Sequence, residues 1–308
     1  MKTLITGASG FVGKALLNHL GAHGHLVVPA VRKTAGLGNE MVVGNIEPST
    51  DWTQALAGCD VVVHLAARVH IMDDDAEDPL TLYRAMNTDS TLNIARQAAA
   101  AGVKRFVFVS TIKVNGEGSH TAYRETDPVA PEDPYAISKW EAEQGLQQIA
   151  LATGLEMVIL RPPLVYGPGV KANFLQLALA VRRGVPLPLG AIRNQRSLLY
   201  LGNLVDAIRL CTEHPGAAGQ TFLLDDGKPV SIPELIHALA HAMGRVARIP
   251  KVPVALLQMA GALVGKRAAV ARLTGSLYVD SSAIKSRLGW APPFSMEAGL
   301  EETLAGLT

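Results

Sequence analysis

Tyr135 and Lys139 are the two residues of this chain whose types and spacing are best suited to acid–base chemistry. They lie four positions apart in a segment with the apolar spacing of a helix, so both side chains point from one face. A phenol has a pKa near ~10, and an adjacent ammonium lowers it by favouring the phenolate. Ser110 and Thr111 close a predicted strand upstream, and a hydroxyl there could hydrogen-bond a reacting carbonyl or carbinol. Together they indicate a site where Tyr135 acts as acid or base.

A glycine-rich segment at the start of the chain, GASGFVG at residues 7–13, has the pattern of a phosphate-binding loop. Gly7 permits a tight turn out of a predicted strand, and Gly10 lets the backbone approach a pyrophosphate. Gly13 lets the following predicted helix pack close to the sheet. Because the strand–loop–helix context is present, the segment predicts a bound dinucleotide rather than a plain turn. The loop residues expected to contact it are Gly7, Ser9, Gly10, Phe11, Val12 and Gly13.

The end of the second predicted strand, residues 26–31, indicates which dinucleotide is bound. NAD-binding units place an Asp or Glu there for the ribose 2′-hydroxyl, but this chain has no acidic residue before Glu40. Arg32 and Lys33 follow the strand instead, and two cations suit a 2′-phosphate. We therefore expect NADP(H) in preference to NAD, with solvated surface charges as the alternative reading of the two cations. Asn45 and Ile46, after a third short strand, are expected near the adenine.

Strand-like runs alternate with helical segments, which predicts an α/β fold with a Rossmann-type, doubly wound parallel sheet. The predicted strands cover residues 4–6, 26–31, 61–65, 106–110, 157–160 and 221–224, and the clearest helices cover 79–101 and 135–153. We assign residues 1–165, with 196–228 returning to them, to a dinucleotide-binding domain. Residues 166–195 and 229–308 are assigned to a smaller C-terminal substrate-binding lobe over the carboxyl ends of the strands. Pro29 is an irregularity inside a strand, because proline lacks an amide donor.

The composition excludes several classes of protein. The 308 residues include 28 basic and 27 acidic side chains, so the net charge of +1 gives no global indication of a nucleic-acid partner. Cys59 and Cys211 lie in no metal-binding or CxxC spacing, which is typical of reduced core residues in a cytoplasmic protein. His237 and His241 are four positions apart but have no third ligand nearby, so we expect no metal.

An apolar stretch at residues 252–265 raises the question of a membrane. It is interrupted by Gln258 and ends at Lys266 and Arg267, and it is too short to cross a bilayer. A packing helix of the second lobe is the simpler interpretation, and a helix lying on a membrane surface is the alternative. We expect no stable membrane insertion, with peripheral contact left open.

Beyond these separate signals, the chain resembles the extended short-chain dehydrogenase/reductases, and among them the nucleotide-sugar epimerase/dehydratase group. The matching segments are GASGFVG at 7–13, DVVVHLAA at 60–67, Asn87, VSTIKVNG at 109–116, PYAISK at 134–139, LRP at 160–162 and LGWAP at 288–292. They extend over nearly the whole chain.

The resemblance implies a role for each matching residue. Thr111 matches the catalytic Ser/Thr and Tyr135 the proton donor and acceptor, while Lys139 matches the residue that binds the nicotinamide ribose. Arg196 resembles the arginine that binds the substrate's diphosphate. Further expected cofactor contacts are Leu65, Ala66, Ala67, Asn87, Tyr135, Lys139 and Pro162, and further expected contacts to a UDP-sugar are Thr111, Lys113 and Asn173. A homodimer formed through the helices that start near Pro79 and Pro134 is also implied.

The departures from the family pattern reduce the number of reactions that this chain could catalyse. The 4,6-dehydratases carry Asp-Glu where this chain has Ile112 and Lys113, so the groups that eliminate water are missing. Asn115 stands where a Tyr is usual, and Leu164 stands where many epimerases have a substrate-binding Asn. There is also no cysteine beside Thr111, as the epimerase-reductases of deoxysugar synthesis would have.

Two reactions at C4 of a nucleotide-activated sugar are left. Since NADPH is the usual donor for single reductions, our first expectation is a UDP-4-keto-6-deoxy-N-acetylhexosamine 4-reductase of surface polysaccharide synthesis. The alternative is a UDP-glucose or UDP-N-acetylglucosamine 4-epimerase, and the apolar stretch at 252–265 adds a lipid-diphosphate sugar epimerase as a smaller alternative. A non-catalytic NADP-sensing regulator is a third class, disfavoured because Thr111, Tyr135 and Lys139 are all present.

Overall fold

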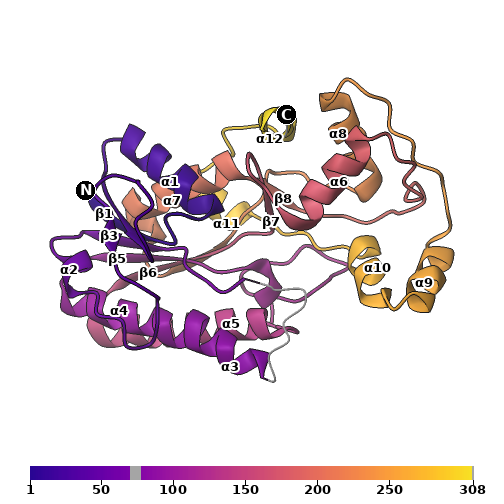
Figure 1. Ribbon diagram of the computed structural model, residues 1–308. Helices are drawn as coiled ribbons and strands as arrows, with labels where there is room; N and C mark the ends of the chain where they lie inside the picture. Colours follow the sequence, from indigo (N-terminus) through magenta and orange to yellow (C-terminus); the bar gives the residue numbers. More distant parts are fainter. Residues whose placement is uncertain (70–77, 307–308) are drawn as a thin grey trace.

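A seven-stranded, wholly parallel sheet forms the centre of the computed structural model, which describes residues 1–69 and 78–306 (Figure 1). The strand order is β3-β2-β1-β4-β5-β6-β9, so the sheet winds in both directions from β1 and β4. This confirms the predicted Rossmann-type fold. The strands are β1 (Lys2–Thr6), β2 (Leu26–Val31), β3 (Met41–Val42), β4 (Val61–His64), β5 (Arg105–Val109), β6 (Glu156–Arg161) and β9 (Gln220–Leu223).

Helices cover both faces of the sheet (Figure 1). One face carries α1 (Phe11–Ala22) and α7 (Leu201–Glu213), and the other carries α4 (Ser90–Ala100) and α5 (Pro134–Thr153). Successive side chains of a strand therefore enter different cores: Leu4 belongs to the cluster under α4, and Ile5 belongs to the cluster under α1. Burial on both faces explains why the strands read as continuous apolar runs.

The helix predicted over residues 79–101 is divided in three. A short α3 (Pro79–Tyr83) leads into a π-helical turn, η1 (Arg84–Asp89), before α4 begins. The smaller elements on the same side are α2 (Thr53–Leu56) and the 3-10 turn η2 (Ile112–Val114). Insertions of π-helix are rare and frequently occur at functional sites.

Pro29 occupies a position in β2 where no donor is required. The Leu26 amide donates to the Met1 carbonyl, on the side of β1. Successive residues of a strand direct their backbone groups to opposite neighbouring strands. Pro29 therefore faces the outer side of β2, where β3 pairs only with Ala30 and Val31. The missing amide removes no ladder hydrogen bond.

Most of the remaining elements extend beyond the carboxyl ends of the strands. They include a small parallel sheet of β7 (Leu164–Tyr166) and β8 (Leu198–Tyr200). The helices are α6 (Ala172–Arg182), α8 (Ile232–Ala242), α9 (Val254–Leu263), α10 (Arg267–Thr274), α11 (Ser282–Leu288) and α12 (Met296–Ala305), with the 3-10 turn η3 (Pro215–Ala217) before β9. Within the described residues, no helix combines the length and apolarity needed to span a bilayer.

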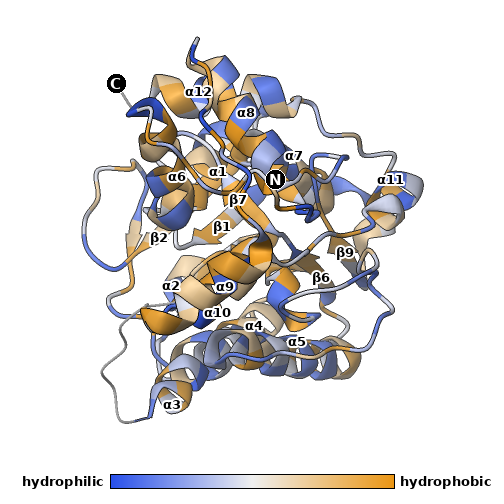
Figure 2. Ribbon diagram, turned by 90° about the vertical axis from the view of Figure 1, so that its right-hand side faces the viewer, coloured by the Kyte–Doolittle hydropathy of each residue, from blue (hydrophilic) through white to orange (hydrophobic). Residues whose placement is uncertain are grey.

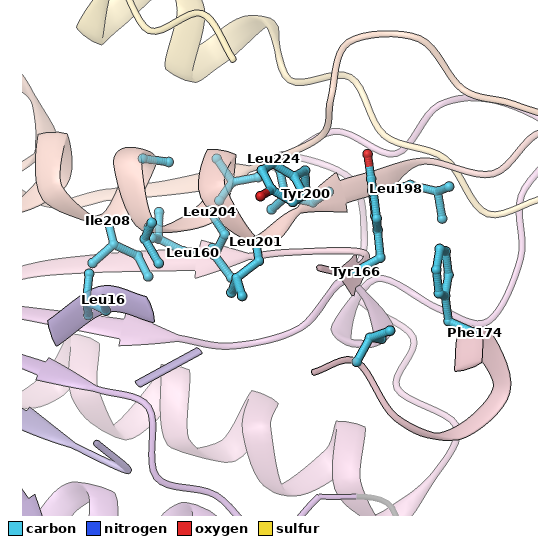
Figure 3. Packing of buried hydrophobic residues seen from close by; sticks show 14 of the residues in the cluster. Leu16, Leu160, Tyr166, Phe174, Leu198, Tyr200, Leu201, Leu204, Ile208 and Leu224 are labelled. Atoms are coloured by element: carbon cyan, nitrogen blue, oxygen red, sulfur yellow. The ribbon is translucent and has the colours of Figure 1, made fainter. Parts of the chain in front are cut away.

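One apolar cluster joins these elements to the sheet. It runs from Leu16 in α1 and Ile208 in α7 to the stacked rings of Tyr166 and Phe174, as Figure 3 shows. The same cluster continues into α8. The nucleotide half and the second lobe thus share a core, and the domain boundaries drawn from the sequence stay a prediction.

Candidate active site

The glycine loop has a backbone that larger residues could not form. Gly7 has φ +67°, and a Cβ there would lie 2.9 Å from the amide nitrogen of Ala66. A Cβ on Gly13 would lie 2.3 Å from the carbonyl oxygen of Gly7. Gly10 donates to that carbonyl at 2.9 Å and begins α1 without a side-chain cap. The first amides of α1 are thus left for an anion, and the loop fits a pyrophosphate.

The segment after β4 lies against this loop and is held by a buried polar chain. The Thr6 hydroxyl accepts from the amides of Leu65 and Ala66, both at 3.2 Å, and contacts Nδ1 of His64 at 2.8 Å. His64 Nε2 in turn contacts Thr91 Oγ1 at 3.0 Å. Burial, with a smaller contribution from Lys139, lowers the pKa of His64 to about 3, so the imidazole is neutral. His64 is therefore a core residue.

Asn87, in the π-helical turn, joins the same segment to α5. Its Nδ2 donates to the Arg68 carbonyl and to the Ser138 hydroxyl, both at 3.0 Å, and its Oδ1 accepts from the Arg68 amide at 2.8 Å. The side chain is fully buried. These bonds engage both polar atoms of the amide, so Asn87 positions the loop at residues 65–68, and its expected contact with the cofactor stays a prediction.

Lys113 connects the two catalytic elements. Thr111 lies directly after β5 and caps η2 by accepting from the Lys113 amide at 3.3 Å, while Tyr135 lies in the first turn of α5. The Lys113 ammonium is 2.6 Å from Asp133, the N-cap of α5, and 2.7 Å from Glu117. It therefore ties the turn of Thr111 to the helix of Tyr135. Two carboxylates already neutralise the charge of Lys113, and its expected role as a substrate contact stays a prediction.

Lys139 follows Tyr135 by one helical turn and is 1% exposed. Its ammonium lies 3.9 Å from the ring centre of Phe108, and burial lowers its pKa to about 7 against the opposing effect of Glu143. The pKa of the Tyr135 phenol is raised, by burial first and then by Asp133 and Tyr83. Burial of the phenol is the main cause of this rise, so Lys139 by itself does not produce the lowering that the sequence predicted.

A buried ionic network, absent from our sequence interpretation, lies under these residues. Glu143 receives two hydrogen bonds from Nε of Arg161 at 3.1 and 3.2 Å and one from Nη2 at 2.5 Å, and it also accepts from the Ser110 hydroxyl. Arg161 Nη1 donates to Asn115 Oδ1 at 3.0 Å. Two features of the sequence could have indicated this network. Glu143 continues the four-residue spacing of Tyr135 and Lys139, and Asn115 replaces the Tyr that is usual in the family.

The residues expected around the adenosine occupy the end of β2 and the loops after it. Arg32 and Lys33 are exposed, and neither side chain has a hydrogen bond or ion pair within residues 1–69 and 78–306. The Glu40 carboxylate accepts hydrogen bonds from the amides of Ala35 and Leu37 and does not occupy the position of Arg32 and Lys33 at the end of β2. Asn45 is exposed, whereas the side chain of Ile46 is buried in the core under α4.

The remaining expected substrate residues lie farther along the chain. Arg196 Nη1 donates to the carbonyls of Arg272 at 3.1 Å and Gly275 at 3.3 Å. Burial lowers its pKa, and Glu117, the partner of Lys113, opposes this. Asn173 is exposed in the first turn of α6, and no contact joins it to the others among the described residues. The Pro162 carbonyl accepts from the Ile112 amide at 3.0 Å, beside Thr111.

These observations define a class: a dinucleotide-binding α/β protein with a Tyr–Lys pair on a helix beside the carboxyl end of its parallel sheet. A family model described as the NAD dependent epimerase/dehydratase family matches residues 3–224, and the chain belongs to this family. It is an enzyme of the extended short-chain dehydrogenase/reductase type, and its cofactor is a nicotinamide dinucleotide. The glycine cradle described above fits such a group.

Relatives and solved structures agree with this assignment. A UDP-glucose 4-epimerase of Vibrio cholerae is 47% identical, over 97% of this chain and 93% of the relative. An N-acetyl-alpha-D-glucosaminyl-diphospho-ditrans,octacis-undecaprenol 4-epimerase of Escherichia coli O157:H7 is 26% identical, over 98% and 93%. The UDP-N-acetylglucosamine 4-epimerase structure from Bacillus cereus shares the fold, with a TM-score of 0.82 over the whole of both chains at 19% identity. In the part of the chain that the structure describes, no group of His, Cys, Asp or Glu side chains could hold a metal.

Proposed function

We propose that this protein is a C4 epimerase of a UDP-sugar, with UDP-glucose and UDP-galactose as its first candidate substrate pair. The observation that carries the proposal is the 47% identity to the Vibrio cholerae UDP-glucose 4-epimerase over nearly the full length of both chains. Our first expectation from the sequence was a 4-keto reductase, and the relatives favour the epimerase alternative. The absence of dehydratase carboxylates at Ile112 and Lys113 agrees with a reaction that keeps the sugar's hydroxyl groups.

The reaction assigns a task to each residue near the end of β5. A nicotinamide dinucleotide held by the glycine loop at residues 7–13 would supply the hydride chemistry at C4 of the sugar. Tyr135 Oη takes the proton of the C4 hydroxyl and later gives it back, and Thr111 Oγ1 hydrogen-bonds the same oxygen. Lys139 places its ammonium one turn below Tyr135, where any positive charge it holds favours the phenolate. Arg196 is assigned to the diphosphate.

The deciding experiment measures cofactor balance. Purified protein is given UDP-glucose without added reductant, and separately UDP-4-keto-6-deoxy-N-acetylglucosamine with NADPH or NADH. We expect UDP-galactose in the first reaction, with no net change in dihydronicotinamide absorbance. Stoichiometric loss of NADPH with the keto sugar, and no epimerisation of UDP-glucose or UDP-N-acetylglucosamine, would make the protein a reductase instead.

We further infer that Arg32 and Lys33 bind the 2′-phosphate of NADP(H). Two exposed cations at the end of β2 support this, since neither has a partner among the described residues, and so does the engagement of Glu40 by its own loop. Arg32→Ala should weaken NADPH binding about tenfold and leave NADH binding nearly unchanged, because only NADPH carries the extra phosphate. Fluorescence titration of both cofactors measures this, and equal losses would contradict the assignment.

A homodimer through α4 and α5 is part of the same proposal. The outer side of these helices carries a groove of about 590 Å³ that includes Leu92, Gly145 and Ile149. Light scattering after size exclusion would detect the dimer.

A further inference from the structure

The helical hairpin of α9 and α10 is joined to the active-site end of the sheet. The segment after α10 places Val279 in a small apolar cluster with Ile112, which follows Thr111, and Leu223, the last residue of β9. Arg196 bonds to carbonyls at the end of α10. In Figure 1 the hairpin lies at the far end of the molecule from the N-terminus, and in Figure 2 α9 lies toward the viewer.

Only one side of α9 is used for packing. Val254 and Leu257 are partly buried against the core, and Gly261 is buried where α10 crosses. A Cβ on Gly261 would lie 2.6 Å from Cγ2 of Val270, so the two helices are closely packed there. The hairpin is therefore held to the protein by the spacing i, i+3, i+7 of this inner side.

A second apolar stripe faces solvent. Leu256, Met259 and Leu263 repeat the spacing i, i+3, i+7 on the outer side, with exposed fractions of 49%, 57% and 82%. Val264 follows, at 68%. Figure 2 colours α9 mostly as hydrophobic. Single exposed apolar residues are ordinary, but a contiguous helical stripe marks a contact surface.

The segment that contains this stripe carries charges of one sign. Residues 235–279 hold no acidic side chain in a chain that has nearly as many acidic as basic residues. The same segment holds six cations, all exposed and without an ion pair among the described residues: Arg245, Arg248, Lys251, Lys266, Arg267 and Arg272. An apolar helix face with basic residues beside it is the pattern of a helix that lies on an anionic lipid surface.

We propose that the α9–α10 hairpin docks this protein on an anionic membrane surface, with Leu256, Met259 and Leu263 entering the headgroup boundary. A second copy of the chain is a poorer occupant, because a two-fold contact through this face would bring the unpaired cations of both copies together. Docking places the end of the sheet that carries Thr111 and Tyr135 next to the membrane. It does not depend on which C4 reaction the site performs.

Vesicle co-sedimentation tests the proposal with the full-length protein. Vesicles of phosphatidylcholine alone are compared with vesicles that contain one-third phosphatidylglycerol, at low and high salt. We expect binding to the anionic vesicles that falls severalfold at high salt, because counter-ions screen the basic side chains. Absence of binding to anionic vesicles, or equal binding to both compositions at every salt concentration, would overturn the proposal.

Matched variants locate the contact. Met259→Ser combined with Leu263→Ser should reduce binding about tenfold or more, since both side chains would enter the lipid. Leu151→Ser removes a leucine that is also 82% exposed, on α5, and should leave binding unchanged. Turnover of UDP-glucose or of the keto sugar confirms that each variant is folded. Unchanged vesicle binding in the double variant would show that α9 is not the lipid contact and would overturn the proposal. A double variant that changes the oligomeric state instead would show that α9 contacts protein rather than lipid.

Discussion

Helices α5 and α9 are both linked to the carboxyl end of the sheet, yet they are held there by opposite means. Polar bonds fix α5 along its length: Asp133 to Lys113 at its start, Ser138 to Asn87 in its first half, and Glu143 to Arg161 below Lys139. Within the described chain, α9 makes no side-chain hydrogen bond and packs by one apolar side.

The difference follows from what each helix has to do. Proton transfer requires Tyr135, Thr111 and Lys139 in fixed mutual positions, and a network of directional bonds supplies this. A surface that meets a fluid partner requires exposed apolar area and charge rather than fixed positions. The apolar residues on the outer side of α9 therefore add little to folding, whereas removing one partner of the buried ion pair under α5 should destabilise the fold.

The largest effect is expected at Tyr135. Tyr135→Phe removes the hydroxyl that exchanges a proton with the sugar, so turnover should fall about a thousandfold. Cofactor binding, measured by fluorescence titration, should stay within a factor of about three. The control is Tyr278→Phe, which removes a hydroxyl that donates to the His120 carbonyl. Wild-type turnover in Tyr135→Phe would refute the catalytic assignment.

Next comes the ionic network under α5. Glu143→Gln leaves the buried Arg161 guanidinium without its counter-charge and should lower the free energy of unfolding by about 3 kcal/mol or more. Glu141 also lies on α5, and Glu141→Gln breaks its more exposed ion pair with Arg84. This substitution should lower the free energy of unfolding by less than about 1 kcal/mol. Urea unfolding of both variants makes the comparison. Similar losses would mean that burial of the network is not what fixes α5.

His64 gives the same region a pH dependence. Its pKa is about 3 in the folded protein, below the ordinary value of 6.5, so the unfolded chain binds more protons between these limits. The stability that neutral His64 contributes is complete above pH 6.5 and is lost as the pH falls toward 3. At pH 4 the loss should be about 3 kcal/mol in the wild type. Urea midpoints at pH 7 and pH 4 should differ less in His64→Gln, and an identical difference would exclude His64 as the cause.

The smallest effect is expected on the outer side of α9. Leu263→Ser should change the free energy of unfolding by less than about 0.5 kcal/mol and leave turnover unchanged, because the side chain is 82% exposed. A matched substitution on the inner side, Leu257→Ser, should destabilise the protein measurably because it removes a core contact. If both substitutions lower the free energy of unfolding by the same amount, the outer side of α9 belongs to the folded core.

Most of the fold could be predicted because its signals are local. The six predicted strands and the glycine loop coincide with observed elements, since apolar runs and glycine positions depend on a few neighbouring residues. The division of residues 79–101 by a π-helical turn was not predicted; Asn87 in this turn bonds to Arg68 and Ser138, which are 19 and 51 positions away, and local spacing does not reveal such contacts. Arg161 was read only as part of a motif, for the same reason.

The sequence by itself determined the parallel α/β architecture, the family, and the identity of the residues that could move a proton, because each is encoded in residue types at short spacing. Tertiary structure alone decided their states. It neutralised Lys113 with Asp133 and Glu117, raised the pKa of the Tyr135 phenol by burial, and left one apolar side of α9 exposed. Charge and burial depend on which distant segments fold against one another, and local sequence carries no record of that.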